Sequence, residues 1–128
     1  MTKLLLDTHT FLWAVTGQGL SAAATTAFLD TANRLHFSAA SYWEICIKLS
    51  LGKLALAPDW RQRFEQEMKI NQIQWLPIAS EHCWQLTQLP FLHCDPFDRL
   101  LIAQAQVEGM ILLTGDSQIH QYPVVTLW

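Results

Sequence analysis

Short apolar segments alternate with longer amphipathic segments along nearly the whole chain, and this alternation constrains the fold more than any other feature. Five apolar segments have the length of buried strands. They are residues 3–6, 35–38, 75–78, 111–114 and 124–127. The segments between them carry apolar residues at three- and four-residue spacing, which is typical of helices. These predicted helices are residues 21–33, 40–51, 59–71, 80–88 and 96–108.

Strands that alternate with helices predict an α/β fold, with a central and mostly parallel sheet of four to five strands covered by helices on both faces. The 128 residues suffice for a buried core, and no repeat or Pro/Gly-rich linker divides them. We therefore expect a single domain over residues 1–128. Gly52 and Gly109 stand where glycine commonly ends a helix.

Composition excludes several classes of protein. With 51% hydrophobic and 15% charged residues, the chain is not expected to be disordered. No apolar run reaches the roughly 18 residues of a membrane span, and the N-terminal residues do not resemble a signal peptide. Three cysteines without a C-x-x-C motif, Cys46, Cys83 and Cys94, indicate reduced and mostly buried thiols in a cytoplasmic protein. A net charge of −3 argues against bulk binding of nucleic acid by positive charge, but not against an enzyme that contacts RNA locally.

Two aspartates directly follow predicted strands. Asp7 follows residues 3–6, and Asp116 follows residues 111–114 after Gly115. In open parallel sheets the functional site lies beyond the carboxyl ends of the strands, where the strand order reverses. If the first and fourth strands are neighbours, these two carboxylates converge.

A second pair of aspartates surrounds Pro96. Proline is favoured as the first residue of a helix, because its missing N–H would have no partner there. Asp95 is then the N-cap, whose carboxylate accepts a backbone N–H of the first turn. Asp98 becomes the third helical residue. From the residues alone, Asp98 is equally a first-turn acid favoured by the helix dipole or a group that performs chemistry.

Glu44 lies in a predicted helix that is otherwise rich in apolar and aromatic residues. One interpretation is an exposed ion pair with Lys48, one turn further on. Such a pair would stabilise the helix by about 0.3 kcal/mol. The other is a carboxylate of the functional site. The residues alone favour the ion pair, although Trp43 and Ile45 on either side of Glu44 make full exposure less comfortable.

Four acids therefore stand near helix starts or strand ends: Asp7, Glu44, Asp98 and Asp116. Two carboxylates about 4 Å apart repel by roughly 4 kcal/mol at an effective dielectric constant near 20. A cluster of four is costly unless the acids take up protons or a cation neutralises them. Hard carboxylate ligands with room for water suit Mg²⁺ or Mn²⁺, which activate water and stabilise charge on a phosphate.

The segments around these acids resemble a known family, the PIN-domain ribonucleases, and within it the VapC-type toxins of bacterial type II toxin–antitoxin systems. The resemblance covers nearly the whole chain. It rests on LLLDTHTFLW at 4–13, SYWEI at 41–45, DPFDRLLIA at 95–103 and LLTGD at 112–116. Each segment alone is weakly specific, whereas four in this order are strongly specific.

The resemblance implies a Mg²⁺-dependent endoribonuclease, with Mn²⁺ as a possible substitute, that cleaves RNA phosphodiester bonds with metal-activated water. Asp7 and Asp98 would be the principal catalytic metal ligands. Glu44 and Asp116 would complete the coordination, directly or through water. The implied partners are an RNA substrate, a small DNA-binding antitoxin and a second copy of the chain in a homodimer, with no membrane.

The resemblance also implies roles for other residues of the chain. Thr114 is expected to hydrogen-bond within the site. Lys48 or Arg99 would contact substrate phosphate, although a solvated helix residue is the favoured interpretation of Arg99. The six tryptophans are expected to pack in the core or at an interface rather than to stack on bases.

Two alternative functions remain open. One is a non-catalytic binding module that uses the same fold. The other is a phosphatase of the haloacid dehalogenase type with Asp7 as the nucleophile. Those phosphatases carry a second aspartate two residues after the nucleophile, where this chain has His9.

Overall fold

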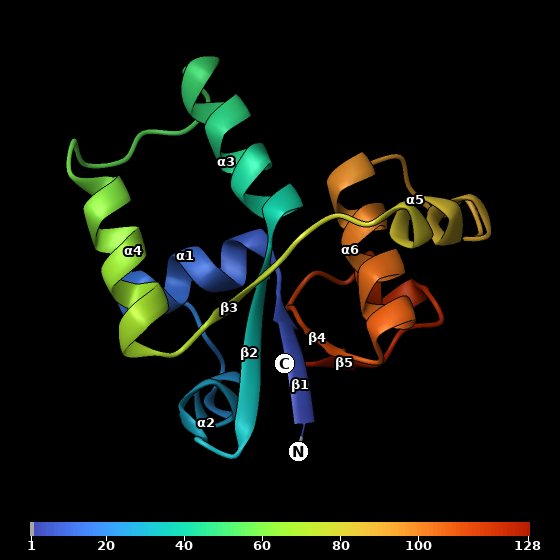
Figure 1. Cartoon of the computed structure of the whole chain (residues 1–128), viewed down its shortest axis with the longest axis horizontal. Helices are drawn as coiled ribbons and strands as arrows, with labels where there is room; N and C mark the ends of the chain where they lie inside the picture. The colour runs from blue at the N-terminus through green and yellow to red at the C-terminus, as the bar shows by residue number, and fades with distance from the viewer. Residues whose placement is uncertain (1) are drawn as a thin grey trace.

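The computed structural model describes residues 2–128 and contains one five-stranded sheet, in the order β3-β2-β1-β4-β5 (Figure 1). The strands are β1 (Thr2–Leu6), β2 (Asn33–Ser38), β3 (Gln74–Leu76), β4 (Ile111–Leu113) and β5 (Thr126–Leu127). Every neighbouring pair is parallel. The α/β prediction is thus confirmed, and the sheet is parallel throughout rather than mostly parallel.

Helices cover both faces of this sheet (Figure 1). The helices are α1 (Thr8–Thr16), α2 (Ala22–Leu29), α3 (Ala39–Ser50), α4 (Trp60–Ile70), α5 (Ser80–Thr87) and α6 (Pro96–Glu108), with a short 3₁₀ turn η1 (Ile119–Gln121). Leu4, Leu6 and Phe37 pack with the first four helices, where Phe11 and Phe64 add aromatic contacts. The alternate side chains of the same strands pack against α6, because successive residues of a strand point to opposite faces.

The observed helices differ most from the predicted ones in the first third of the chain. Helix α1 is absent from the predicted helices, because the β-branched residues Thr8 and Thr10 in its first turn have low helix propensity. The helix predicted over residues 21–33 ends at Leu29, and Asn33 already belongs to β2. The helix predicted over residues 96–108 has the observed bounds.

Strands β1 and β4 are neighbours, as the convergence of Asp7 and Asp116 requires. The strand order reverses between them, since β2 and β3 lie on one side of β1, and β4 and β5 lie on the other. The Thr10 hydroxyl donates to the Leu113 carbonyl at 2.9 Å, which joins the start of α1 to the end of β4. The carboxyl ends of β1 and β4 therefore meet at one edge, which we call the carboxyl edge.

One expectation about burial is wrong. The three cysteines are free thiols, but Cys83 and Cys94 are exposed, which contradicts the prediction of mostly buried cysteines. Trp43 and Trp84 are 58% and 69% exposed, so for these two tryptophans only packing at an interface stays a prediction. Within residues 2–128, none of the helices combines the length and the apolar character needed to cross a membrane.

Candidate functional site

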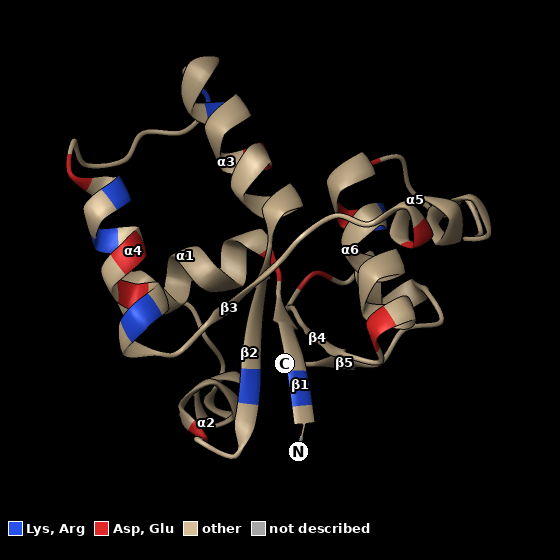
Figure 2. Ribbon diagram, in the orientation of Figure 1, with Lys and Arg blue, Asp and Glu red and all other residues tan. Residues whose placement is uncertain are grey.

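The four acids selected from the sequence line one small cavity at the carboxyl edge. Asp7, Glu44, Asp98 and Asp116 surround a volume of about 100 Å³, together with Thr8, His9, Lys48 and Asp95. Acidic residues are visible at the carboxyl ends of β1 and β4 in Figure 2. We refer to this cavity as the acid pocket.

Asp7 is fixed at the base of the acid pocket. It is the N-cap of α1, and its Oδ1 accepts a hydrogen bond from the Thr10 backbone N–H at 2.6 Å. Its Oδ2 accepts a short hydrogen bond from the Thr114 hydroxyl. The same Thr114 hydroxyl oxygen accepts the Asp116 backbone N–H at 3.1 Å. Thr114 therefore hydrogen-bonds within the site, as expected, and links the acids that follow β1 and β4.

Glu44 is buried, with only 6% of its surface exposed. Its Oε2 pairs with Lys48 Nζ at 3.1 Å, and its Oε1 accepts a hydrogen bond from the Thr8 hydroxyl at 2.7 Å. The ion pair with Lys48 is thus present, but the expectation that it is exposed is wrong for Glu44. Thr8 was not predicted to be a residue of the site, although it directly follows Asp7.

Asp95 and Asp98 take the places predicted for them at the start of α6. Asp95 is the N-cap, with Oδ1 accepting the backbone N–H of Phe97 at 2.9 Å and of Asp98 at 3.2 Å, and Pro96 begins the helix. A hydrogen bond of 2.6 Å between Ser38, the N-cap of α3, and Gln104 of α6 joins the two helices that carry Glu44 and Asp98.

The pKa of Asp98 is raised from 3.8 to about 6, most strongly by burial and also by the negative charges of Asp95, Asp116 and Glu44, while a hydrogen bond from His93 opposes this rise. Desolvation and like charges both disfavour the ionised form of a carboxyl group. The acid pocket is therefore electrostatically unfavourable in the absence of a cation.

Arg99 was interpreted from the sequence either as a contact to substrate phosphate or as a solvated helix residue, and its observed place fits neither interpretation. Its side chain is 5% exposed and its guanidinium lies 4.5 Å above the Phe91 ring. It donates to the Pro90 carbonyl at 2.9 Å and to the Tyr122 hydroxyl oxygen at 3.1 Å. Arg99 is therefore neither solvated nor placed in the acid pocket, and it fixes the segment before α6.

The chemistry of these donors fits a divalent cation that keeps part of its water. Among residues 2–128, no group of three or more His, Cys, Asp or Glu side chains is arranged to hold a metal ion as it stands. Mg²⁺ commonly binds through one or two carboxylates and retains several waters. A cavity of about 100 Å³ has room for about three waters at roughly 30 Å³ each. The four acids fit such a hydrated ion better than a fully dehydrated one.

Comparison with known proteins gives consistent results. A family model described as PIN domain matches residues 4–125. Ribonuclease VapC22 of Mycobacterium tuberculosis (strain ATCC 25618 / H37Rv) is 29% identical over 143 residues, and the alignment covers 100% of both chains.

Solved structures share the fold at low sequence identity. A chain of the VapBC2 complex from Rickettsia felis, bound to a DNA fragment from its promoter, has a TM-score of 0.73 at 14% identity, with 98% of each chain covered. A chain of DNA-bound VapBC from Salmonella typhimurium has a TM-score of 0.71 at 18% identity, covering 100% of this chain and 98% of that one.

Proposed function

Because this chain belongs to the PIN domain family, we propose that it is a Mg²⁺-dependent endoribonuclease and the toxin of a type II toxin–antitoxin system. The observation that carries the proposal is the acid pocket, in which four carboxylates from separate segments line one cavity of about 100 Å³. A bound divalent cation would activate water and stabilise the charge that develops on the scissile phosphate.

Asp7 and Asp98 are the proposed principal metal ligands. The hydrogen bonds from Thr10 and Thr114 hold the Asp7 carboxylate in one orientation. Each carboxylate oxygen can accept more than one bond, so Asp7 keeps coordinating capacity beside these two donors. Mn²⁺ would substitute for Mg²⁺, since both are hard cations that take oxygen ligands.

Glu44 and Asp116 are proposed to complete the coordination, directly or through water, and to orient the attacking water. Lys48 neutralises one oxygen of Glu44, while Thr8 donates to the other. These two contacts orient a buried carboxylate at the wall of the pocket. Lys48 is itself only partly buried, so it can also contact a phosphate group of the substrate.

The toxin assignment is supported by the full-length similarity to a protein named Ribonuclease VapC22. The matching folds from VapBC complexes support a small DNA-binding antitoxin as partner. We propose a homodimer in the cytoplasm that binds this antitoxin. An arginine of the antitoxin would neutralise negative charge in the acid pocket, because a guanidinium can pair with a carboxylate through two hydrogen bonds.

The acid pocket favours this proposal over the alternatives. A non-catalytic module would gain nothing from burying mutually repelling carboxylates. A phosphatase with Asp7 as the nucleophile is disfavoured because His9 stands where such enzymes carry a second acid.

The test is cleavage of structured RNA by the purified protein with Mg²⁺, with chelator, and with the variant Asp7→Asn. We expect cleavage with Mg²⁺, its loss in chelator, and its loss in Asp7→Asn without loss of the fold. Asp30→Asn is the matched control, because Asp30 lies at the opposite edge of the sheet. Undiminished cleavage in chelator would falsify the metal mechanism.

A further inference from the structure

We propose that His93 is a positioning residue for Asp98, and that Tyr122 and Arg99 select the tautomer in which it does so. The inference rests on the proposed function, because Asp98 is a proposed metal ligand. The four groups form one continuous chain of contacts from the interior to the acid pocket, through Arg99, Tyr122, His93 and Asp98. His93 lies outside the four acids and does not line the acid pocket.

The hydroxyl of Tyr122 has two acceptors within reach, His93 Nδ1 at 2.8 Å and, much farther away, the His93 carbonyl at 3.5 Å. Its oxygen accepts hydrogen bonds from Arg99 Nη1 at 3.1 Å and from the His93 backbone N–H at 3.1 Å, with the Leu92 N–H at 3.3 Å. A phenolic oxygen has two lone pairs and one proton. The remaining close partner is His93 Nδ1 at 2.8 Å, so the hydroxyl donates to this nitrogen.

This hydrogen bond determines the tautomer of the His93 ring. In a neutral imidazole, one nitrogen accepts and the other carries the proton. Since Nδ1 accepts from Tyr122, Nε2 carries the proton and donates it toward Asp98 Oδ2, which lies at 3.4 Å. Oδ1 of Asp98 accepts no hydrogen bond from residues 2–128. The contact with His93 therefore orients the carboxylate and leaves Oδ1 free to coordinate a cation in the acid pocket.

Arg99 disfavours the opposite tautomer of His93, in which Nδ1 would carry the proton and donate it to the Tyr122 oxygen. Its cation is buried and, within residues 2–128, it forms no ion pair with a carboxylate. With this cation 3.1 Å away, the Tyr122 oxygen is held as an acceptor, and the Tyr122 proton is directed to the ring of His93. The carbonyls of Pro90 and Leu86 hold the guanidinium in place, at 2.9 and 3.4 Å.

The role is one of positioning, because His93 acts through Asp98. Groups that hydrogen-bond a metal ligand fix its orientation, and their removal typically weakens metal binding by about 10- to 100-fold. We therefore expect the network to affect metal affinity and turnover while leaving the affinity for RNA almost unchanged.

The experiment compares the variants Tyr122→Phe, His93→Gln and the double variant with wild type. Tyr122→Phe removes the hydroxyl and keeps the ring. His93→Gln supplies an amide N–H to Asp98 that needs no choice of tautomer. Tyr42→Phe is the control for losing a phenol hydroxyl, because Tyr42 packs among Trp60, Phe64 and Trp75. The readouts are ¹⁵N shifts of the His93 ring without metal, Mn²⁺ affinity by calorimetry, and kcat and KM for RNA cleavage.

We expect the Nε2–H tautomer in wild type and its loss or averaging in Tyr122→Phe. Mn²⁺ affinity should fall about tenfold in Tyr122→Phe, and kcat should fall while KM stays within about twofold. His93→Gln should retain most of the affinity, and adding Tyr122→Phe to it should weaken binding no further. Tyr42→Phe should behave as wild type.

An Nδ1–H tautomer in wild type, or unchanged Mn²⁺ affinity in Tyr122→Phe, would overturn the inference. A lower thermal midpoint alone would assign the network to holding the segment before α6, and this too would overturn it. If wild type binds Mn²⁺ with the expected variant pattern but does not cleave RNA, the proposed function fails and the positioning of Asp98 stands.

Discussion

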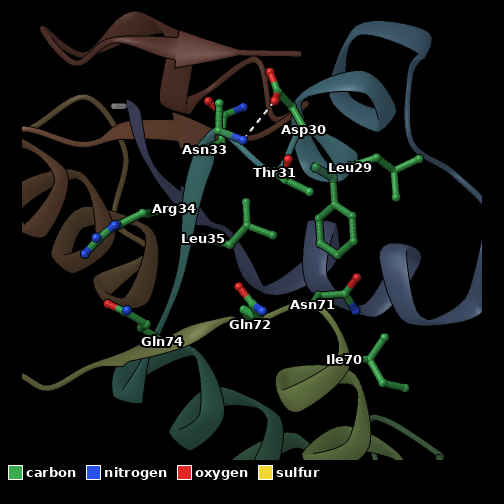
Figure 3. A pocket seen from close by; sticks show the side chains of 12 residues that line it. Leu29, Asp30, Thr31, Asn33, Arg34, Leu35, Ile70, Asn71, Gln72 and Gln74 are labelled. Atoms are coloured by element: carbon green, nitrogen blue, oxygen red, sulfur yellow. Dashed lines mark hydrogen bonds between the residues drawn. The ribbon is translucent and has the colours of Figure 1, made fainter.

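The two ends of the parallel sheet differ in cavity size and in the kind of side chain that they gather. At the amino ends of the strands lies a cavity of about 620 Å³, whereas the acid pocket at the carboxyl edge measures about 100 Å³. Figure 3 shows the larger cavity, with Asn33, Asn71, Gln72, Gln74 and Arg34 around it. Its acid, Asp30, accepts the Ala32 backbone N–H at 2.9 Å and so stabilises a turn. Volume alone would select the larger cavity, whereas the mutually perturbing acids line the smaller one.

The difference follows from helix direction. In a parallel sheet with helical crossovers, helices begin near the carboxyl ends of strands and end near the amino ends. Helices α1, α3 and α6 begin at the carboxyl edge with the N-caps Asp7, Ser38 and Asp95. Their N-terminal dipoles favour nearby negative charge. The larger cavity is lined instead by residues at the ends of α2 and α4, where no such positive potential supports acids.

The largest expected difference between the two ends is in catalysis. Asp98→Asn removes an anionic oxygen from the acid pocket, and we expect RNA cleavage to fall by more than about 100-fold, beyond the loss typical of residues that only support a ligand. Arg34→Gln, at the larger cavity, should cleave at the wild-type rate. The measurement is kcat/KM at saturating Mg²⁺. Equal losses of kcat/KM in the two variants would show that the two ends of the sheet do not differ in their part in catalysis.

The acid pocket should also reduce stability. Because the pKa of Asp98 rises from 3.8 to about 6 on folding, the folded state binds this proton more tightly, and stability is lost as pH rises from about 4 to about 6. The full shift corresponds to about 3 kcal/mol, and solvent screening of a partly exposed group reduces it to about 1–2 kcal/mol.

Asp98→Asn should therefore raise the free energy of unfolding by about 1–2 kcal/mol at pH 7 in the presence of chelator. The gain should disappear near pH 4, where the wild-type carboxyl group is protonated in both states. Denaturant unfolding at the two pH values measures it. A variant less stable than wild type at pH 7 would show that Asp98 is a structural residue.

Asp95 should respond in the opposite way to its neighbour. Asp95→Ala should cost about 1 kcal/mol of stability, because an N–H at the start of α6 loses its acceptor. Asp95→Asn keeps an acceptor oxygen and should retain both stability and cleavage within about tenfold. Thermal midpoints and cleavage rates of both variants test this. An inactive Asp95→Asn beside an active Asp98→Asn would reverse the two roles.

The smallest expected effect lies at the larger cavity. Gln72 has φ of 53°, a left-handed conformation that is unfavourable for a residue with a Cβ. Gln72→Gly removes this strain but gains conformational entropy when unfolded, so stability should rise by no more than about 0.5 kcal/mol. Cleavage should not change. A change in cleavage would assign this end of the sheet a part in the reaction.

How far the sequence predicts the site depends on how many residues separate the interacting groups along the chain. The start of α6 was predictable because Asp95 caps its own helix through backbone groups two and three residues away. The convergence of Asp7 and Asp116 followed from a general property of parallel sheets. Both predictions use local spacing or topology.

The remaining contacts depend on packing between distant segments. Arg99 meets Tyr122, 23 residues later, and Thr8 meets Glu44, 36 residues later. Nothing in the spacing of these residues encodes such pairs, so Arg99 was expected to be solvated. The burial of Glu44 was not predictable for the same reason, since its local partner Lys48 is typical of an exposed helix face.

We propose that the carboxyl edge holds a divalent cation on its four acids. Titration of Mn²⁺ into wild type, Asp98→Asn and Asp30→Asn, followed by calorimetry in metal-free buffer, tests it directly. Wild type and Asp30→Asn should show the same saturable binding, and Asp98→Asn should weaken it by at least about tenfold. Binding that is unchanged in Asp98→Asn, or is lost in Asp30→Asn instead, would contradict a metal site on these four acids.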